Sequence, residues 1–172
     1  MSEDGGVKAG KTSIDLFLSR LDPELRRARV IETRPDLARQ MTAWGAQWVS
    51  LAQEIGLACP PELILLGDAM AHQFIYIRVL DHDYALLSPE EARRERAALA
   101  VRGANYGVAD RSAMLPIFGQ DGDLLLLATD GIHAMAHDEM DVDDIVARSL
   151  AELLAEACAA FAHDPIASPQ SK

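Results

Sequence analysis

The chain of 172 residues has few aromatic side chains, and this shortage limits how its core can be built. Phe, Trp and Tyr make up 5% of the residues, while hydrophobic residues as a whole make up 49%. The apolar content is therefore mostly alanine and leucine, which favours helices with a modest β-sheet. A chain of this length can bury a sizeable core in one domain without disulfides or metal ions.

Cysteine and long apolar runs are also scarce. The only two cysteines, Cys59 and Cys158, form no CxxC pair and lie in a predicted loop and a predicted helix. We therefore expect two small apolar thiols rather than a disulfide. The first residues, MSEDGGVKAGKTS, contain no apolar segment or cleavage site, and no apolar run approaches the roughly 18 residues that span a membrane. These features predict a soluble, cytoplasmic protein.

Positive charge is in short supply. The chain has 16 Lys and Arg against 27 Asp and Glu, which gives a net charge of −11. This excess of negative charge disfavours binding to nucleic acid or to an anionic membrane surface. We expect neither as a partner, and a protein with a basic surface is the natural complement.

Residues 5–12, GGVKAGKT, match the pattern of a phosphate-binding loop. A working loop of this kind follows a buried β-strand and opens a helix, so that backbone N–H groups converge on the phosphates. Only four residues precede the match, too few for such a strand. We therefore interpret residues 1–12 as a flexible tail and expect no nucleotide cofactor.

The stretch from Leu115 to His137 predicts the centre of the fold. LPIF reads as a short strand, Gly119-Gln120-Asp121-Gly122 as a turn, and Asp123 to Ala128 as a second strand that is apolar on both faces. A second turn at Asp130-Gly131 leads to an alternating strand, Ile132 to His137.

The remaining segments complete an α+β domain. We predict one domain, residues 13–163, built on a mainly antiparallel sheet of about four to six strands flanked by helices. Residues 13–32 are a predicted N-terminal helical extension, and residues 164–172 a flexible tail. The other expected elements are a helix from Thr33 to Ile55, a short helical segment from Glu62, a hairpin of Gln73–Leu80 and Tyr84–Leu87 with a turn at Asp81-His82-Asp83, a helix from Ser88 to Val101, a loop from Arg102 to Ala113, an acidic connection from Asp138 to Asp144, and a helix from Ser149 to Ala162.

The best candidate for a metal site is His133 and His137 with Asp138 and Glu139. Histidines four apart can share zinc on a helix, but on a strand they are about 13 Å apart. We therefore expect surface histidines and no metal. Acid/base catalysis needs two carboxylates in unlike environments. The paired carboxylates, such as Asp121 and Asp123, lie in turns where both would be solvated by water, so we do not expect them to be catalytic.

Several segments together resemble the SUKH superfamily, the Smi/Knr-like domains. The resemblance covers Trp48 to Phe161. The segments that carry it are SLAQEIGLACPPELILL, the strand-to-helix step LLSPEEARRE, the meander LPIFGQDGDLLLLATDGIHAMAHD and the closing helix IVARSLAELLAEACAAF. The resemblance implies a non-enzymatic bacterial immunity protein that binds and blocks a cognate toxin, often a nuclease. Gly67-Asp68 replaces the family's usual Asn-Gly, so a related immunity family with similar topology is an alternative.

These observations lead to one expected function and two alternatives. The first is an intracellular immunity protein that presents acidic residues to the basic surface of a toxin, through Asp81, His82, Asp83, Asp121, Asp123, Asp138, Glu139 and Asp141. The alternatives are a regulatory scaffold or adaptor domain, and a small metal-dependent hydrolase that uses His133 and His137. The sequence does not fix the oligomeric state.

Overall fold

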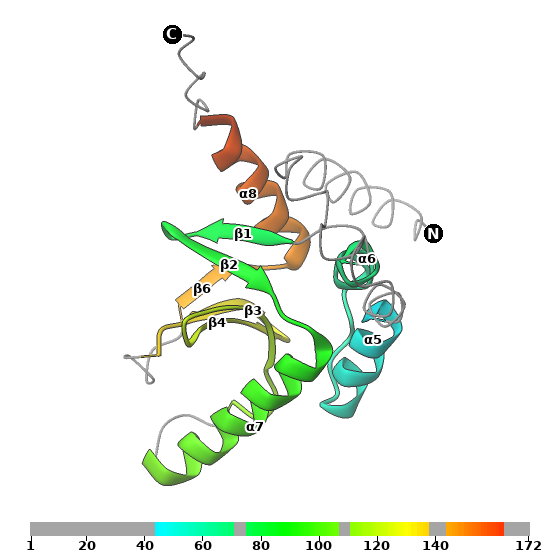
Figure 1. Cartoon of the computed structure of the whole chain (residues 1–172), viewed down its shortest axis with the longest axis vertical. Helices are drawn as coiled ribbons and strands as arrows, with labels where there is room; N and C mark the ends of the chain where they lie inside the picture. The colour runs from blue at the N-terminus through cyan, green and yellow to red at the C-terminus, as the bar shows by residue number, and fades with distance from the viewer. Residues whose placement is uncertain (1–43, 71–74, 107–110, 138–143, 164–172) are drawn as a thin grey trace, which may run out of the picture.

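A six-stranded antiparallel sheet lies at the centre of the protein, with its strands in the order β1-β2-β3-β4-β5-β6 (Figure 1). The computed structural model describes residues 44–70, 75–106, 111–137 and 144–163. The chain is an α+β domain, as predicted from the sequence. The strands are β1 (Tyr76–Val79), β2 (His82–Leu86), β3 (Leu115–Gln120), β4 (Asp123–Ala128), β5 (Gly131–Met135) and β6 (Asp144–Ala147).

The predicted meander is confirmed as β3, β4 and β5, with small shifts at its ends. Strand β3 runs through Gly119 to Gln120, and the turn to β4 is the pair Asp121 and Gly122. Both residues have positive φ, 48° and 97°, which is the backbone of a tight two-residue hairpin loop. The final strand ends at Met135, before His137.

A register shift in β3 supplies core side chains that simple alternation would miss. Pro116 pairs with Leu126 and Phe118 pairs with Leu125, so Ile117 is the extra residue of a bulge. Ile117 and Phe118 are both fully buried in the main core.

The turn of the β1–β2 hairpin is shorter than predicted and begins one residue earlier. Val79 pairs with His82, so the turn consists of Leu80 and Asp81 alone, with φ of 49° and 66°. His82 and Asp83 lie in β2, not in the turn as predicted. The sixth strand, β6, was not predicted, because its four residues DIVA adjoin an acidic stretch that reads as a connection.

Four helices pack around the sheet in the part of the chain that the structure describes. Their bounds are α5 (Trp44–Glu54), α6 (Pro61–Ala69), α7 (Pro89–Tyr106) and α8 (Leu150–His163). Helix α5 ends before Gly56, whose φ of 74° is a left-handed stop that suits glycine. Helix α7 continues to Tyr106, so the segment predicted as a loop from Arg102 begins as helix.

Two capping boxes start α7 and α8, as their sequences predict. At α7, the Glu91 N–H donates to the Ser88 hydroxyl at 3.1 Å, and the Ser88 N–H donates to the Glu91 carboxylate at 2.7 Å. At α8, the Glu152 N–H donates to the Ser149 hydroxyl at 3.1 Å, but the Glu152 carboxylate accepts the N–H of Arg148 instead. Both arrangements satisfy backbone donors that would otherwise lack a partner.

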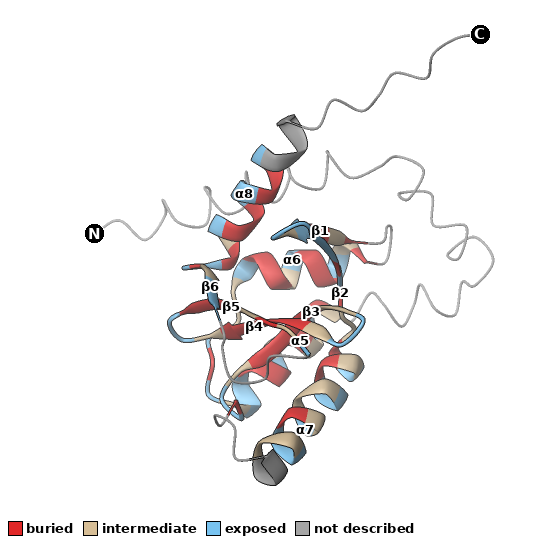
Figure 2. Ribbon diagram, turned by 90° about the vertical axis from the view of Figure 1, so that its left-hand side faces the viewer, coloured by how far each residue is buried: buried red, intermediate tan, exposed pale blue. Residues whose placement is uncertain are grey.

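The core occupies both faces of the sheet. On one face α5, α6 and α8 cover the main cluster, which includes the fully buried Trp48, Leu66 and Phe118. On the other face, Leu99 of α7 packs against Leu126 and neighbouring residues of β4 and β5. Figure 2 shows buried positions along β4 and α6, and buried alternating with exposed positions along α8.

Some predictions lie outside the described residues. These are the tail 1–12, the helical extension 13–32, the first part of the helix from Thr33, the acidic connection 138–143 and the tail 164–172. Among the helices that the structure describes, none has the length and apolar content needed to cross a membrane.

Candidate functional site

The antiparallel order of the strands brings two turns and the end of β5 to one end of the sheet. Each strand reverses the direction of the one before it, so the β1–β2 turn, the β3–β4 turn and the end of β5 lie on the same side. We call this the turn end, defined by the residues Leu80, Asp81, His82, Asp83, Asp121, Gly122, Asp123, His137 and Asp144. Five residues predicted to bind a partner meet here: Asp81, His82, Asp83, Asp121 and Asp123. Asp138, Glu139 and Asp141 lie outside the described residues.

Asp123 holds the turn end together. Its Oδ1 accepts the backbone N–H of His137 at 2.8 Å and lies 2.8 Å from Nδ1 of the same residue. Partial burial opposes ionisation of Asp123, but these hydrogen bonds, with the charges of His137 and His82, hold the pKa of the Asp123 carboxyl below its usual range. The carboxylate therefore fixes the β3–β4 turn to the end of β5.

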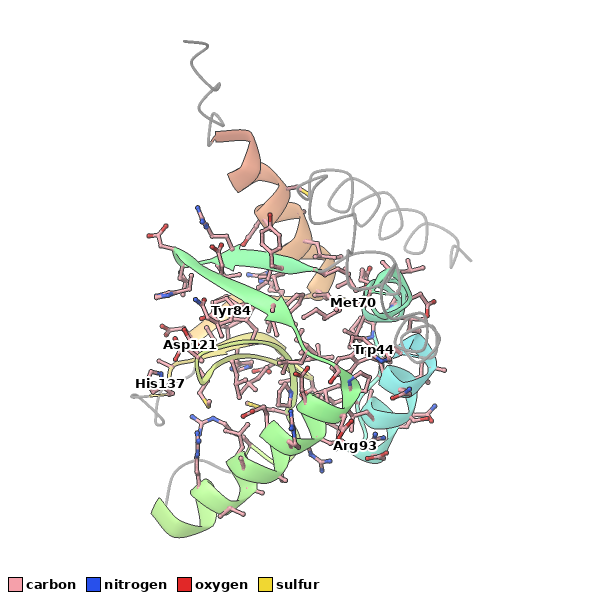
Figure 3. All side chains as sticks on the ribbon, in the orientation of Figure 1. Trp44, Met70, Tyr84, Arg93, Asp121 and His137 are labelled. Carbon is pink, nitrogen blue, oxygen red and sulfur yellow. The ribbon has the colours of Figure 1, made fainter. Side chains whose placement is uncertain are left out.

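Tyr84 of β2 is influenced by the charge of this carboxylate. The side chain is almost fully buried in the main core. Burial, reinforced by the negative charge of Asp123, raises the pKa of the Tyr84 phenol. Figure 3 shows Tyr84, Asp121 and His137 on the same side of the molecule.

The charge of Asp83 is paired with that of an arginine. Arg78 lies opposite it in the β1–β2 ladder and donates from Nε and a terminal nitrogen to the two carboxylate oxygens, at 2.9 and 3.1 Å. The hydrogen bonds from Arg78 lower the pKa of the Asp83 carboxyl. Asp83 therefore adds less to the negative field of the turn end than its sequence position suggested.

Asp81 and Asp121 are the outward charges of the site. Both are exposed and both occupy left-handed turn positions, with φ of 66° and 48°. Asp tolerates this backbone better than most residues. Asp144, also exposed, starts β6, where it pairs with Ala134 of β5. The turn end therefore presents solvated carboxylates on short, fixed connections.

His133 is buried, contrary to the expectation that the histidines lie on the surface. Only 7% of the residue is exposed, and its Nε2 lies 2.8 Å from Oδ1 of Asp130. The imidazole holds the pKa of the Asp130 carboxyl below its usual range. Nδ1 of His133 is buried without a hydrogen-bond partner.

The two histidines of the HxxxH pattern do not share a partner. His133 contacts Asp130 at the opposite end of β5, whereas His137 contacts Asp123 at the turn end. Within the described ranges, no group of three or more His, Cys, Asp or Glu side chains is placed to hold a metal ion. Asp138 and Glu139, the other residues of that hypothesis, are outside those ranges.

Sequence reasoning missed the roles of Arg78 and Leu80. A hairpin register with a two-residue turn would have paired Arg78 with Asp83, but the predicted turn was one residue too long. Leu80 was assigned to a strand, and nothing in its residue type indicates a left-handed turn position.

The turn end is the candidate site, and it is defined by geometry alone. The chain matches no family model, no curated protein and no solved structure.

Proposed function

We propose that the protein is a non-catalytic immunity protein that uses the acidic turn end to bind and block a basic toxin. The observation that carries the proposal is the convergence of Asp81, from the β1–β2 hairpin, with Asp121 and Asp123, from the β3–β4 hairpin, at one end of the sheet. A further support is the net charge of −11. The resemblance of the chain to the SUKH superfamily suggests the same function.

Charge explains why a toxin that acts on nucleic acid would be a suitable partner. Such a protein tends to carry a basic cleft that attracts phosphates. An acidic surface of matching shape is steered onto the cleft over long range and then excludes the substrate. The solvated carboxylates of Asp81 and Asp121 supply the negative electrostatic field of the turn end.

The connections at the turn end also limit the entropy lost on binding. The two turns contain two residues each, and the bonds from His137 to Asp123 tie the second turn to β5. A surface that is already ordered in the free protein loses less conformational freedom when a partner binds. The turn end is therefore suited to rapid and tight association.

Paired neutralisations test the proposal against a candidate toxin encoded next to the gene. Asp81→Asn with Asp121→Asn removes two charges and leaves residues that tolerate the left-handed backbone. The control, Glu90→Gln with Glu156→Gln, removes the same charge from exposed positions on α7 and α8. Binding rates and affinities are measured by surface plasmon resonance at low and high salt.

We expect the turn-end variant to associate more slowly and to bind at least about tenfold more weakly at low salt, with a smaller difference at high salt. The control should bind like the wild type. Equal binding by both variants would remove the turn end as the surface. Failure of the wild-type protein to bind the toxin, or to protect cells from it, would overturn the function itself.

A further inference from the structure

Leu80 is an exposed apolar side chain at the tip of the β1–β2 hairpin. It is 64% exposed, more than any other large hydrophobic residue in the described part of the chain. Asp81 adjoins it, and the acidic β3–β4 turn lies at the same end of the sheet. An apolar group therefore projects from an otherwise charged surface.

The backbone of Leu80 makes this placement unfavourable for folding. Its φ is 49°, and the following residue is also left-handed. In such a turn the Cβ of an L residue crowds the backbone, so that Asn or Gly is preferred at these positions. Leucine at this position therefore adds backbone strain and exposes apolar surface to water, and little of its side chain is buried against the rest of the protein.

Other exposed hydrophobic residues do not combine these features. Val101 on α7 is 60% exposed and Ile145 on β6 is 54% exposed. Neither has a positive φ. They occupy regular helix and strand positions, where single exposed apolar residues are common.

We propose that Leu80 is the apolar contact through which the turn end binds its partner, and that the partner offers an apolar pocket rimmed by Lys or Arg. This inference rests on the proposed function. Binding energy in protein interfaces is concentrated in a few buried side chains surrounded by polar contacts that exclude water. Leu80 supplies the apolar group, and Asp81 and Asp121 supply the acidic rim that complements a basic partner.

The variant Leu80→Asn separates binding from stability. Asparagine suits the left-handed turn, so we expect the melting temperature to rise by a few degrees, about 2 to 4 °C. Binding to the candidate toxin should weaken at least about tenfold. Leu80→Met keeps an apolar side chain at the same position and should retain most of the affinity. Val101→Gln removes a similarly exposed hydrophobic side chain from α7 and should bind like the wild type.

The outcomes distinguish this inference from the proposed function. If the wild type binds and Leu80→Asn binds equally well, the turn end remains the surface and Leu80 is not its apolar contact. A lower melting temperature for Leu80→Asn would contradict the argument that leucine is unfavourable for folding there. Equal losses in Leu80→Asn and Val101→Gln would also overturn the assignment. A wild-type protein that does not bind the toxin overturns both proposals.

Discussion

The pairing of Asp123 with His137 should make the stability of the protein depend on pH in a defined direction. A hydrogen bond to a charged group contributes about 1.5 to 3 kcal/mol when it is shielded from water. Here the side chains are 22% exposed for Asp123 and 49% exposed for His137, so the lower part of that range applies. Asp123→Ala, which also removes the acceptor of the His137 backbone N–H, should lower the free energy of unfolding by about 2 kcal/mol at pH 7.

The sign of the pH dependence follows from the lowered pKa of Asp123. The unfolded chain takes up a proton on this carboxyl near pH 4, whereas the folded protein resists it to lower pH. The stabilisation is therefore complete above about pH 4 and is lost as the pH falls through the folded pKa. The difference between wild type and Asp123→Ala should shrink accordingly.

A double-mutant cycle isolates the side-chain pair. Urea unfolding of wild type, Asp123→Ala, His137→Ala and the double variant gives the coupling between the two side chains, because His137→Ala keeps its backbone N–H. We expect a coupling of about 1 kcal/mol at pH 7 that declines below about pH 4. A coupling near zero at pH 7, or one that does not change with acid, would refute the assigned role of this carboxylate.

Two further changes test the packing of the helices and the state of a thiol. Gly67→Ala should lower the free energy of unfolding by about 1 to 2 kcal/mol in urea titrations, because the added methyl would lie 2.9 Å from Cδ1 of the buried Trp48. A gain in stability, as expected for an exposed helical glycine, would contradict this close approach of α5 and α6. Burial raises the pKa of the Cys59 thiol to about 11. Alkylation by iodoacetamide at pH 7.5 should therefore be roughly a hundredfold slower than for a free cysteine and should accelerate on addition of urea.

Local signals in the sequence predicted most of the elements. The β3–β4–β5 meander was predicted because apolar runs of strand length alternate with Asp-Gly turns. The helix starts at Ser88 and Ser149 were predicted because a hydroxyl residue precedes a glutamate by three positions. These features depend on neighbours in sequence, so no knowledge of the tertiary structure was needed.

The remaining features depend on contacts between distant residues. Strand β6 is four residues long, and its pairing with β5 makes it a strand. The burial of His133 and its contact with Asp130 could not be read from a strand pattern that placed it with His137 on one face. The candidate acidic residues could be named from the sequence, but their meeting at one end required the order of all six strands.

Helix α8 determines how late in synthesis the core of the protein can be completed. The helix contacts β1 at one edge of the sheet and β5 and β6 at the other, as well as α6. The contacts with β1 and α6 join segments that are far apart in the chain, and such contacts slow folding because long loops must close first. During synthesis the earlier strands can form before α8 has been made, but the main core then lacks the part of its cover that α8 supplies. We expect the ribosome-bound chain to remain sensitive to proteases, and to chaperone binding, until α8 has emerged from the exit tunnel.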